Sequence, residues 1–231
     1  MSALFSCEKE NTAVPPVITE DTTVVIKPKD TIRSYLALGD SYTIGQSVLE
    51  EDRFPVQTVR LLITDSIKFS SEIIAQTGWT TTNLLNRINS KPPLKSSYDI
   101  VTLLIGVNNQ YQGLSQDQYR TEFTTLLNKS IVFAGNKTNR VIVLSIPDYS
   151  VTPFADGYNI SKIAAEIDSF NVINKEITLA AGVTYLDITS STRLAENDDS
   201  LIAYDGLHPS GKEYAKWAIW LAPMIKDALK N

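Results

Sequence analysis

Short apolar runs alternate with longer amphipathic stretches along most of the chain. The apolar runs predict five strands, at 35–38, 72–75, 99–105, 140–146 and 183–188. The longer stretches predict helices over 53–64, 81–88, 115–133, 160–180 and 209–229. The run at 99–105 is almost continuously apolar, as expected of a central strand that is covered on both faces. This alternation indicates one α/β domain built on a mostly parallel sheet.

The first thirty residues do not follow this pattern. Residues 11–30 are rich in Thr, Pro and charge without a helical period, which is typical of a linker. Before them, Leu4-Phe5-Ser6-Cys7 resembles the end of a bacterial lipoprotein signal, although the apolar stretch is short and a basic region before it is missing. The alternative is an unpaired cysteine in a disordered tail. We therefore expect residues 1–30 to be a flexible tail or lipid tether, and residues 31–231 to be the folded domain.

Composition removes several classes of function. The net charge of −5 argues against binding to nucleic acid, which needs clustered Lys and Arg. No run approaches the roughly 18 apolar residues of a membrane span, so we expect membrane contact only through a lipid on Cys7. The single Cys cannot form an internal disulfide, and the single His excludes a multi-His metal site. Any imidazole catalysis must therefore use His208.

Ser41 follows the first predicted strand within the sequence Gly39-Asp40-Ser41. A serine between a strand and a helix exposes its hydroxyl, and the nearby amides favour a developing negative charge. The stretch is not the G-x-S-x-G elbow of the α/β-hydrolases, because Thr43 stands in place of the second glycine. A serine at such a junction is also a common helix N-cap, so this stretch alone leaves both roles open.

His208 lies in the sequence Asp205-Gly206-Leu207-His208-Pro209. A hydroxyl becomes a good nucleophile when a base removes its proton, and that base needs a partner to fix its tautomer. Three residues of separation in a tight loop can place the Asp205 carboxylate beside His208 Nδ1, so that Nε2 faces a serine. The alternative is a lone histidine that caps the last helix, which we expect to begin at Pro209 because proline is tolerated in a first turn.

Two further segments follow predicted strands. Gly78 could offer an unobstructed backbone N–H to an oxyanion, and Asn108 could offer its side-chain amide. Each is ordinary turn chemistry when taken alone. Because ligand sites in such folds lie at the carboxyl ends of the strands, we expect Ser41, Gly78 and Asn108 to share one edge of the sheet.

These four segments, in this order, resemble the SGNH (GDSL) hydrolase family over roughly residues 35 to 225. The resemblance implies a flavodoxin-like three-layer α/β/α sandwich and a serine-dependent ester hydrolase that uses no metal or cofactor. It implies a catalytic triad of Ser41, Asp205 and His208. It also implies an oxyanion hole made by the N–H groups of Ser41 and Gly78 and by the amide of Asn108.

The chain departs from the family pattern at two positions. Tyr42 stands where the family usually has leucine, a change that we expect not to touch the chemistry. Asn109 stands where aspartate commonly follows the oxyanion asparagine. Asn is nearly isosteric with Asp but uncharged, so we expect the ordering of this loop to differ from that of the family.

The substrate follows less directly from the sequence. The aromatic residues Trp79, Tyr42, Tyr111 and Tyr204 lie near the four segments and could line a sugar or acyl site, or could simply pack in its wall. With Cys7 lipidated, the leading expectation is a cell-envelope esterase, periplasmic or on the outer membrane, that removes small acyl groups from carbohydrate. The alternatives are a lysophospholipase or general acyl esterase, a catalytically silent glycan-binding module, and a cytoplasmic location. A mononucleotide binder is disfavoured because no Gly-rich phosphate loop follows the first strand.

Overall fold

The computed structural model describes residue 1, residues 31–64 and residues 66–230, so the expectations for residues 2–30 and for Cys7 lie outside the described part of the chain. The strands are β1 (Thr31–Gly39), β2 (Ile67–Ala75), β3 (Ile100–Leu104), β4 (Val141–Leu144) and β5 (Thr184–Leu186). They form one sheet in the order β2-β1-β3-β4-β5, and every neighbouring pair is parallel. The predicted five-stranded parallel sheet is confirmed.

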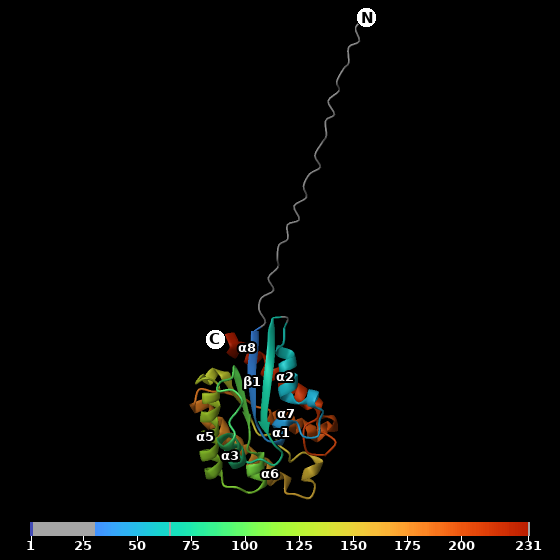
Figure 1. Cartoon of the computed structure of the whole chain (residues 1–231). Helices are drawn as coiled ribbons and strands as arrows, with labels where there is room; N and C mark the ends of the chain where they lie inside the picture. Colours follow the sequence, from blue (N-terminus) through green and yellow to red (C-terminus); the bar gives the residue numbers. More distant parts are fainter. Residues whose placement is uncertain (2–30, 65, 231) are drawn as a thin grey trace.

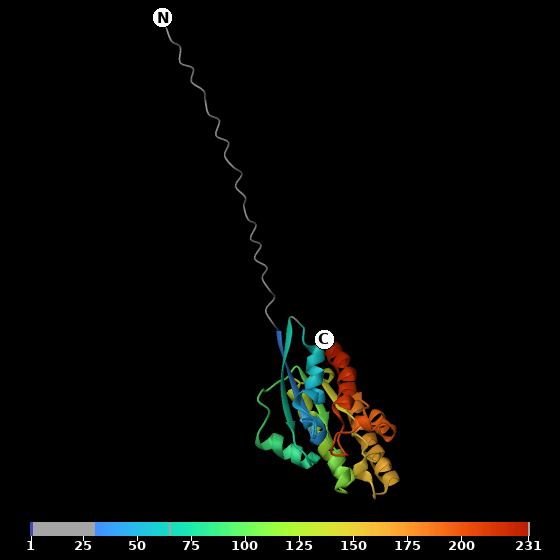
Figure 2. The same cartoon turned by 90° about the vertical axis from the view of Figure 1, so that its right-hand side faces the viewer.

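Helices cover both faces of the sheet (Figures 1 and 2). The long helices are α2 (Phe54–Leu62), α3 (Thr81–Ser90), α5 (Gln116–Phe133), α6 (Ile160–Ala180) and α8 (Gly211–Lys230). Helix α2 packs against α8, whereas α5 packs between α3 and α6 in a second group. The short helices are α1 (Ser41–Ile44), α4 (Val107–Tyr111) and α7 (Thr189–Thr192). The 3₁₀ turns are η1 (Glu50–Asp52), η2 (Thr138–Arg140), η3 (Pro153–Ala155), η4 (Arg193–Asn197) and η5 (Asp199–Leu201). The three-layer α/β/α arrangement is confirmed.

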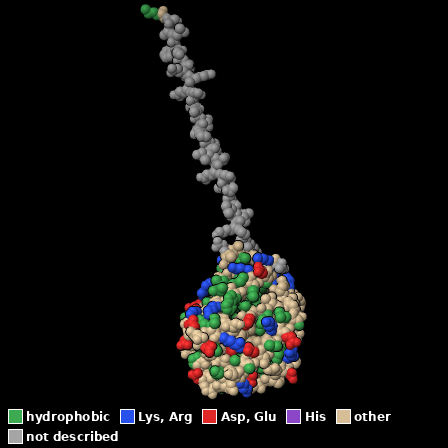
Figure 3. Space-filling model, turned by 180° about the vertical axis from the view of Figure 1, so that it is seen from behind, with side chains coloured by type: hydrophobic (Ala, Val, Ile, Leu, Met, Phe, Trp, Pro, Cys, Tyr) green, Lys and Arg blue, Asp and Glu red, His purple; other side chains and the backbone are tan. Residues whose placement is uncertain are grey.

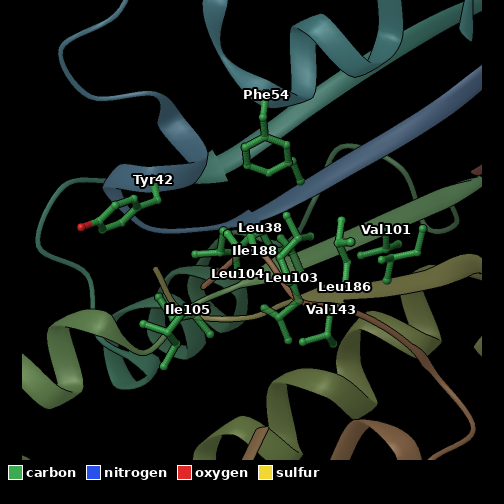
Figure 4. Close-up of a cluster of buried hydrophobic side chains, with 14 of the residues drawn as sticks. Leu38, Tyr42, Phe54, Val101, Leu103, Leu104, Ile105, Val143, Leu186 and Ile188 are labelled. Atoms are coloured by element: carbon green, nitrogen blue, oxygen red, sulfur yellow. The ribbon is translucent and has the colours of Figure 1, made fainter. Parts of the chain in front are cut away.

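The main core lies on the central strands. All five residues of β3 are buried, and so are all four residues of β4. In Figure 4, Leu38, Leu103 and Val143 meet at the centre of this cluster, and Phe54 reaches it from α2. A polar pair inside the sheet, Tyr35 and Thr102, is satisfied by a 2.9 Å hydrogen bond between the two hydroxyls. Strands that are buried on both faces explain the continuous apolar run in the sequence.

The strands β1 and β2 are longer than predicted, and they pair from Thr31 with Ile67 to Gly39 with Ala75. Their early residues are mostly exposed or half-buried, since β2 is the edge strand of the sheet. An edge strand contributes fewer residues to the core, so polar residues occur there and shorten the apolar run that the sequence displays. The predicted segments are therefore the C-terminal parts of both strands, which contain no exposed residue.

The last helix begins at Gly211, which corrects the prediction that Pro209 lies in its first turn. Pro209 instead forms an isolated antiparallel bridge with Ile202. The adjacent amides of Ala203 and Ser210 complete this pairing by donating to the carbonyls of His208 and Leu201, at 2.7 Å and 2.8 Å. The pairing holds the segment around His208 extended and delays the start of the helix.

The surface shows no concentration of positive charge on the face seen in Figure 3, where acidic, basic and hydrophobic side chains are interspersed. Among the helices of the described residues, none is long and apolar enough to cross a membrane.

Candidate active site

Ser41 begins helix α1 immediately after the carboxyl end of β1. Gly39, the last residue of β1, has no space for a side chain, because a Cβ there would lie 2.4 Å from the Leu104 carbonyl oxygen of the neighbouring strand. The helix N-cap is Asp40, whose Oδ1 accepts a 3.0 Å hydrogen bond from the Tyr42 amide. Ser41 is therefore not the N-cap, and the residue as a whole is 4% exposed.

In the first turn of α1, the Ser41 amide alone has no hydrogen-bond partner among the described residues. The Asp40 side chain binds the Tyr42 amide, and its carbonyl accepts from the amides of Thr43 and Ile44 at 3.1 Å and 3.0 Å. An unpaired N–H at the start of a helix turn is a ready donor for an anion.

His208 and Asp205 form a direct pair, with Nδ1 of the imidazole 2.6 Å from Asp205 Oδ2. The other oxygen, Oδ1, accepts from the backbone amides of Leu207 and His208, each at 3.0 Å. The side chain of His208 is 7% exposed, and that of Asp205 is 24% exposed. The imidazole therefore binds a carboxylate and does not cap a helix, and its Nε2 is directed away from Asp205.

The hydrogen bonds around Asp205 keep its carboxylate ionised. Partial burial alone would raise the pKa of Asp205, but the Ser47 hydroxyl, the His208 amide and ring and the Leu207 amide outweigh it and lower the pKa to about 2. Ser47 Oγ donates to Oδ2 at 2.6 Å, an interaction that no sequence motif indicates.

Gly78 lies on the loop that follows β2, and Asn108 lies in α4, shortly after β3. Gly78 has a φ of +80°, and its amide donates no hydrogen bond within the described part of the chain. Asn108 Nδ2 donates to the Trp79 carbonyl oxygen at 3.0 Å. This bond uses one of the two N–H groups of the amide and fixes its orientation, so the second N–H is left for a ligand.

One cavity of about 120 Å³ brings most of the predicted residues together. Ser41, Gly78, Asn108 and His208 all line it, while Asp205 stands behind the imidazole. Within the described residues, no group of three or more His, Cys, Asp or Glu side chains is arranged to hold a metal ion. The arrangement offers a hydroxyl, a base and hydrogen-bond donors to one bound molecule, which suits acyl transfer.

The sequence profile of the GDSL-like lipase/acylhydrolase family matches residues 37–216, most of the chain and the whole of this site. The chain belongs to this family. It is a carboxylic ester hydrolase, as its family indicates.

Solved structures of similar fold include lipases and an acetylxylan esterase. The chain is similar to the lipase/acylhydrolase from Enterococcus faecalis, with 19% identity, a TM-score of 0.64, and 84% of this chain and 96% of that chain covered. It is similar to the acetylxylan esterase Axe2 from Geobacillus stearothermophilus, with 18% identity, a TM-score of 0.64, and 87% and 96% covered. It is also similar to the lipase Lip_vut3 from a goat rumen metagenome, with 20% identity, a TM-score of 0.65, and 83% of this chain and 97% of that chain covered. None of the curated protein sequences matches this chain.

Asn109 of this GDSL-like esterase replaces the aspartate that the family commonly has, and it is fully buried. Its Oδ1 accepts from the Thr81 amide at 3.0 Å, and its Nδ2 donates to Thr81 Oγ1 at 2.7 Å. Thr81 Oγ1 in turn donates to Glu122, which supplies a carboxylate from α5. Asn109 therefore joins α4 to the start of α3 through hydrogen bonds from both the oxygen and the nitrogen of its side-chain amide. These bonds fix the segment without an acidic side chain at position 109.

Tyr42 corrects the expectation that this departure from the family pattern does not touch the chemistry. Its ring lies against the His208 imidazole, with the ring centroids 5.1 Å apart and the planes inclined at 54°. Tyr42 also lines the cavity, and Figure 4 shows it at the edge of the buried cluster with its phenol oxygen directed away from the core. The side chain therefore limits the movement of the imidazole.

Asp40 fixes the start of α1 through its hydrogen bonds to the backbone amides of the first turn. Burial raises the pKa of Asp40 to about 7, although the hydrogen bond from the Tyr42 amide acts in the opposite direction. Its Oδ2 is buried without a partner among the described residues. Ionisation of Asp40 is therefore unfavourable in the folded state, and stability from this residue is fully present at low pH and is lost as pH rises through about 7.

The aromatic residues of the site are only partly those expected. Tyr42 and Tyr111 line the cavity, whereas Trp79 does not, and Tyr204 is 89% exposed. Tyr149 and Phe154 line it as well. Both follow the carboxyl end of β4, and that position in the sequence was the available signal for them.

Proposed function

We propose that this esterase acts through a catalytic triad of Ser41, His208 and Asp205, and that its substrates carry small acyl groups on carbohydrate. One observation carries the first part of the proposal: Ser41 and His208 line the same cavity, and Asp205 holds the opposite side of the imidazole through Nδ1. A nucleophile, a base and an orienting carboxylate in this relation are the minimal apparatus of serine hydrolysis.

The reaction begins when His208 Nε2 takes the Ser41 proton and Oγ attacks the ester carbonyl carbon. The tetrahedral intermediate then collapses, and the imidazolium gives its proton to the departing alcohol. Water, activated by the same base, attacks the acyl group on Ser41 and releases the acid. Asp205 remains ionised throughout, because its pKa of about 2 lies far below the pH at which the imidazole works.

Three donors are available for the negative charge of that intermediate. The unpaired amides of Ser41 and Gly78 and the free N–H of Asn108 belong to residues that line one cavity. Donors that are fixed before the reaction bind the oxyanion better than the ground-state carbonyl, so they lower the barrier.

Replacing Asn108 and its neighbour Asn109 separates the two amides by role. Asn108→Ala is expected to lower kcat by roughly 10²–10³ with little change in KM, because it removes a donor to the transition state. Asn109→Ala is expected to lower the melting temperature while affecting kcat less, since Asn109 is buried and bonded to Thr81. Steady-state kinetics and thermal unfolding of both variants provide the test. The reverse ranking would show that the oxyanion donor is assigned to the wrong asparagine.

The aromatic side of the cavity supports a carbohydrate substrate. The ring of Tyr111 lies 6.2 Å from that of Tyr149 and 5.9 Å from that of Phe154, and Phe154 stacks on Tyr158 at 6.1 Å. Tyr111 and Tyr158 are 49% and 55% exposed. A sugar ring can lay its C–H face on such a ring while its hydroxyls stay in water. The cell-envelope location expected from Cys7 suits the same class of substrate, and a solved structure of similar fold is described as an acetylxylan esterase.

A general acyl esterase or lysophospholipase is the second candidate, because Val107 and Leu207 add apolar surface to the same cavity. Acetylated xylo-oligosaccharide should be compared with p-nitrophenyl acetate, butyrate, octanoate and palmitate. We expect kcat/KM to be highest for the acetylated sugar and to fall as the acyl chain lengthens. Activity that rises through octanoate and palmitate would replace our substrate with the second candidate. Failure of an organophosphonate to label Ser41 would favour a silent binding module.

Tyr111 tests the sugar-binding wall directly. Tyr111→Ala is expected to raise KM for the acetylated oligosaccharide by about tenfold, the order of a lost aromatic contact. It should leave KM for methyl acetate, which has no ring to stack, unchanged. Tyr204→Ala is the matched control, since Tyr204 is exposed and does not line the cavity. Equal effects of Tyr111→Ala on both esters would remove the sugar-binding role.

A further inference from the structure

Ser47 combines an unfavourable backbone conformation with a short hydrogen bond to the proposed triad. Its φ is +67°, and only one other non-glycine residue of the described chain, Asn136, has a positive φ. Glycine adopts this left-handed region freely, whereas a residue with a Cβ is strained there. A strained residue persists where its surroundings hold it, and such positions gather at functional sites.

The Ser47 hydroxyl completes the coordination of Asp205. Oδ1 of that carboxylate accepts two backbone amides, and Oδ2 accepts the His208 ring and Ser47 Oγ, the last two each at 2.6 Å. A carboxylate offers about four acceptor positions. All of them are filled here, so the carboxylate has no freedom to rotate away from the imidazole.

This hydrogen bond also joins two distant segments of the chain. Ser47 lies on the loop that leaves α1, and the Gln46 amide on that loop bonds back to the Ser41 carbonyl at 3.0 Å. The Gln46 side chain accepts from Thr77 Oγ1 at 2.7 Å, which secures the loop at a second point. Asp205 lies 158 residues further along the chain. The hydrogen bond therefore joins the loop after α1, the helix that begins with Ser41, to the loop that carries Asp205 and His208.

We propose that Ser47 is a positioning residue, whose hydroxyl holds Asp205 against the nucleophile loop and so sets the place of the His208 imidazole relative to Ser41. The proposal rests on the triad proposed above. Ser47 does not line the cavity, so it is not assigned any contact with substrate.

The proposal predicts a specific kinetic change for Ser47→Gly, which removes the hydroxyl and suits the left-handed backbone. We expect kcat to fall about tenfold, the scale of one hydrogen bond to a charged group, with KM unchanged. Without this donor the Asp205 charge is less neutralised and favours the imidazolium more. The acid limb of the kcat/KM profile should therefore move to higher pH.

Other ionisable groups near the imidazole stay in place in this variant. Tyr42 packs on the ring of His208. Asp148 and Glu213 line a smaller cavity that His208 and Tyr42 also line. Asn136→Gly is the matched control, because it makes the same change at the other left-handed position, on the turn after α5 and away from the site. It should leave kcat and the pH profile unchanged.

The outcomes separate this proposal from the proposed function. If Ser41→Ala is inactive but Ser47→Gly matches the unchanged protein in kcat and in pH profile, the positioning role is wrong and the triad stands. If Ser41→Ala remains active, the triad is wrong. In that case the proton NMR titration of the single histidine still tests Ser47. An upward shift of the histidine titration midpoint in Ser47→Gly supports the positioning of Asp205 by Ser47, and an unmoved midpoint overturns it.

Discussion

Ser41→Ala is expected to lower ester hydrolysis by roughly 10⁴-fold or more, because the variant has no group to form the acyl-enzyme. The melting temperature should change little. The Ser41 side chain makes no hydrogen bond to the described residues, and its loss removes only one oxygen from the wall of a cavity. Initial rates on p-nitrophenyl acetate and a thermal unfolding curve measure both quantities.

A buried serine elsewhere supplies the control for this substitution. Ser130 on α5 is fully buried, donates to the Leu126 carbonyl and does not line the cavity. Ser130→Ala should keep the full rate. If Ser41→Ala retained a tenth of the activity, Ser41 would not be the nucleophile.

Asp205→Asn is expected to lower kcat by roughly 10³–10⁴-fold, because it reverses the hydrogen bond that sets the imidazole tautomer. In the unchanged protein, Asp205 Oδ2 accepts the hydrogen bond from His208 Nδ1. An amide nitrogen in its place would donate to Nδ1, and the ring proton would then occupy Nε2. That nitrogen could no longer take the Ser41 proton. Nitrogen-15 NMR of the single histidine reports the tautomer directly.

The pH dependence of stability gives Asp205→Asn a second readout. A carboxylate with a lowered pKa adds stability above its ordinary value near 3.9, and this stability is lost as pH falls toward about 2. The variant should therefore be less stable than the unchanged protein at neutral pH, and the difference should shrink in acid.

Asp198 provides a control with similar electrostatics. Hydrogen bonds from Ser200 and Lys212 lower the pKa of Asp198 to about 2, and the residue lies apart from the imidazole. Asp198→Asn should leave kcat and the histidine tautomer unchanged. An equal fall in kcat for both variants would mean that Asp205 acts through general stability.

The local parts of the site could be predicted from sequence. Asp205 and His208 are three residues apart, so one turn is enough to bring the carboxylate to Nδ1. Ser41, Gly78 and Asn108 each follow a strand, and parallel strands end at one edge. The alternative of Ser41 as a helix cap was wrong for a local reason, since Asp40, one residue earlier, caps α1 with its side chain.

What the sequence alone determined is the succession of strands and helices, the fold class and the four segments that carry the chemistry. Each of these leaves a periodic or short-range mark, because it depends on residues close together in the chain. Only the tertiary structure decided that Ser47 donates a hydrogen bond to Asp205 and that the Tyr42 ring packs against His208. It also decided that Tyr149 and Phe154 line the cavity. These contacts join segments far apart in the chain through ordinary residue types. Which of many serines or aromatic rings meets the site depends on how the crossovers and loops place them, and that placement has no periodic pattern in the sequence.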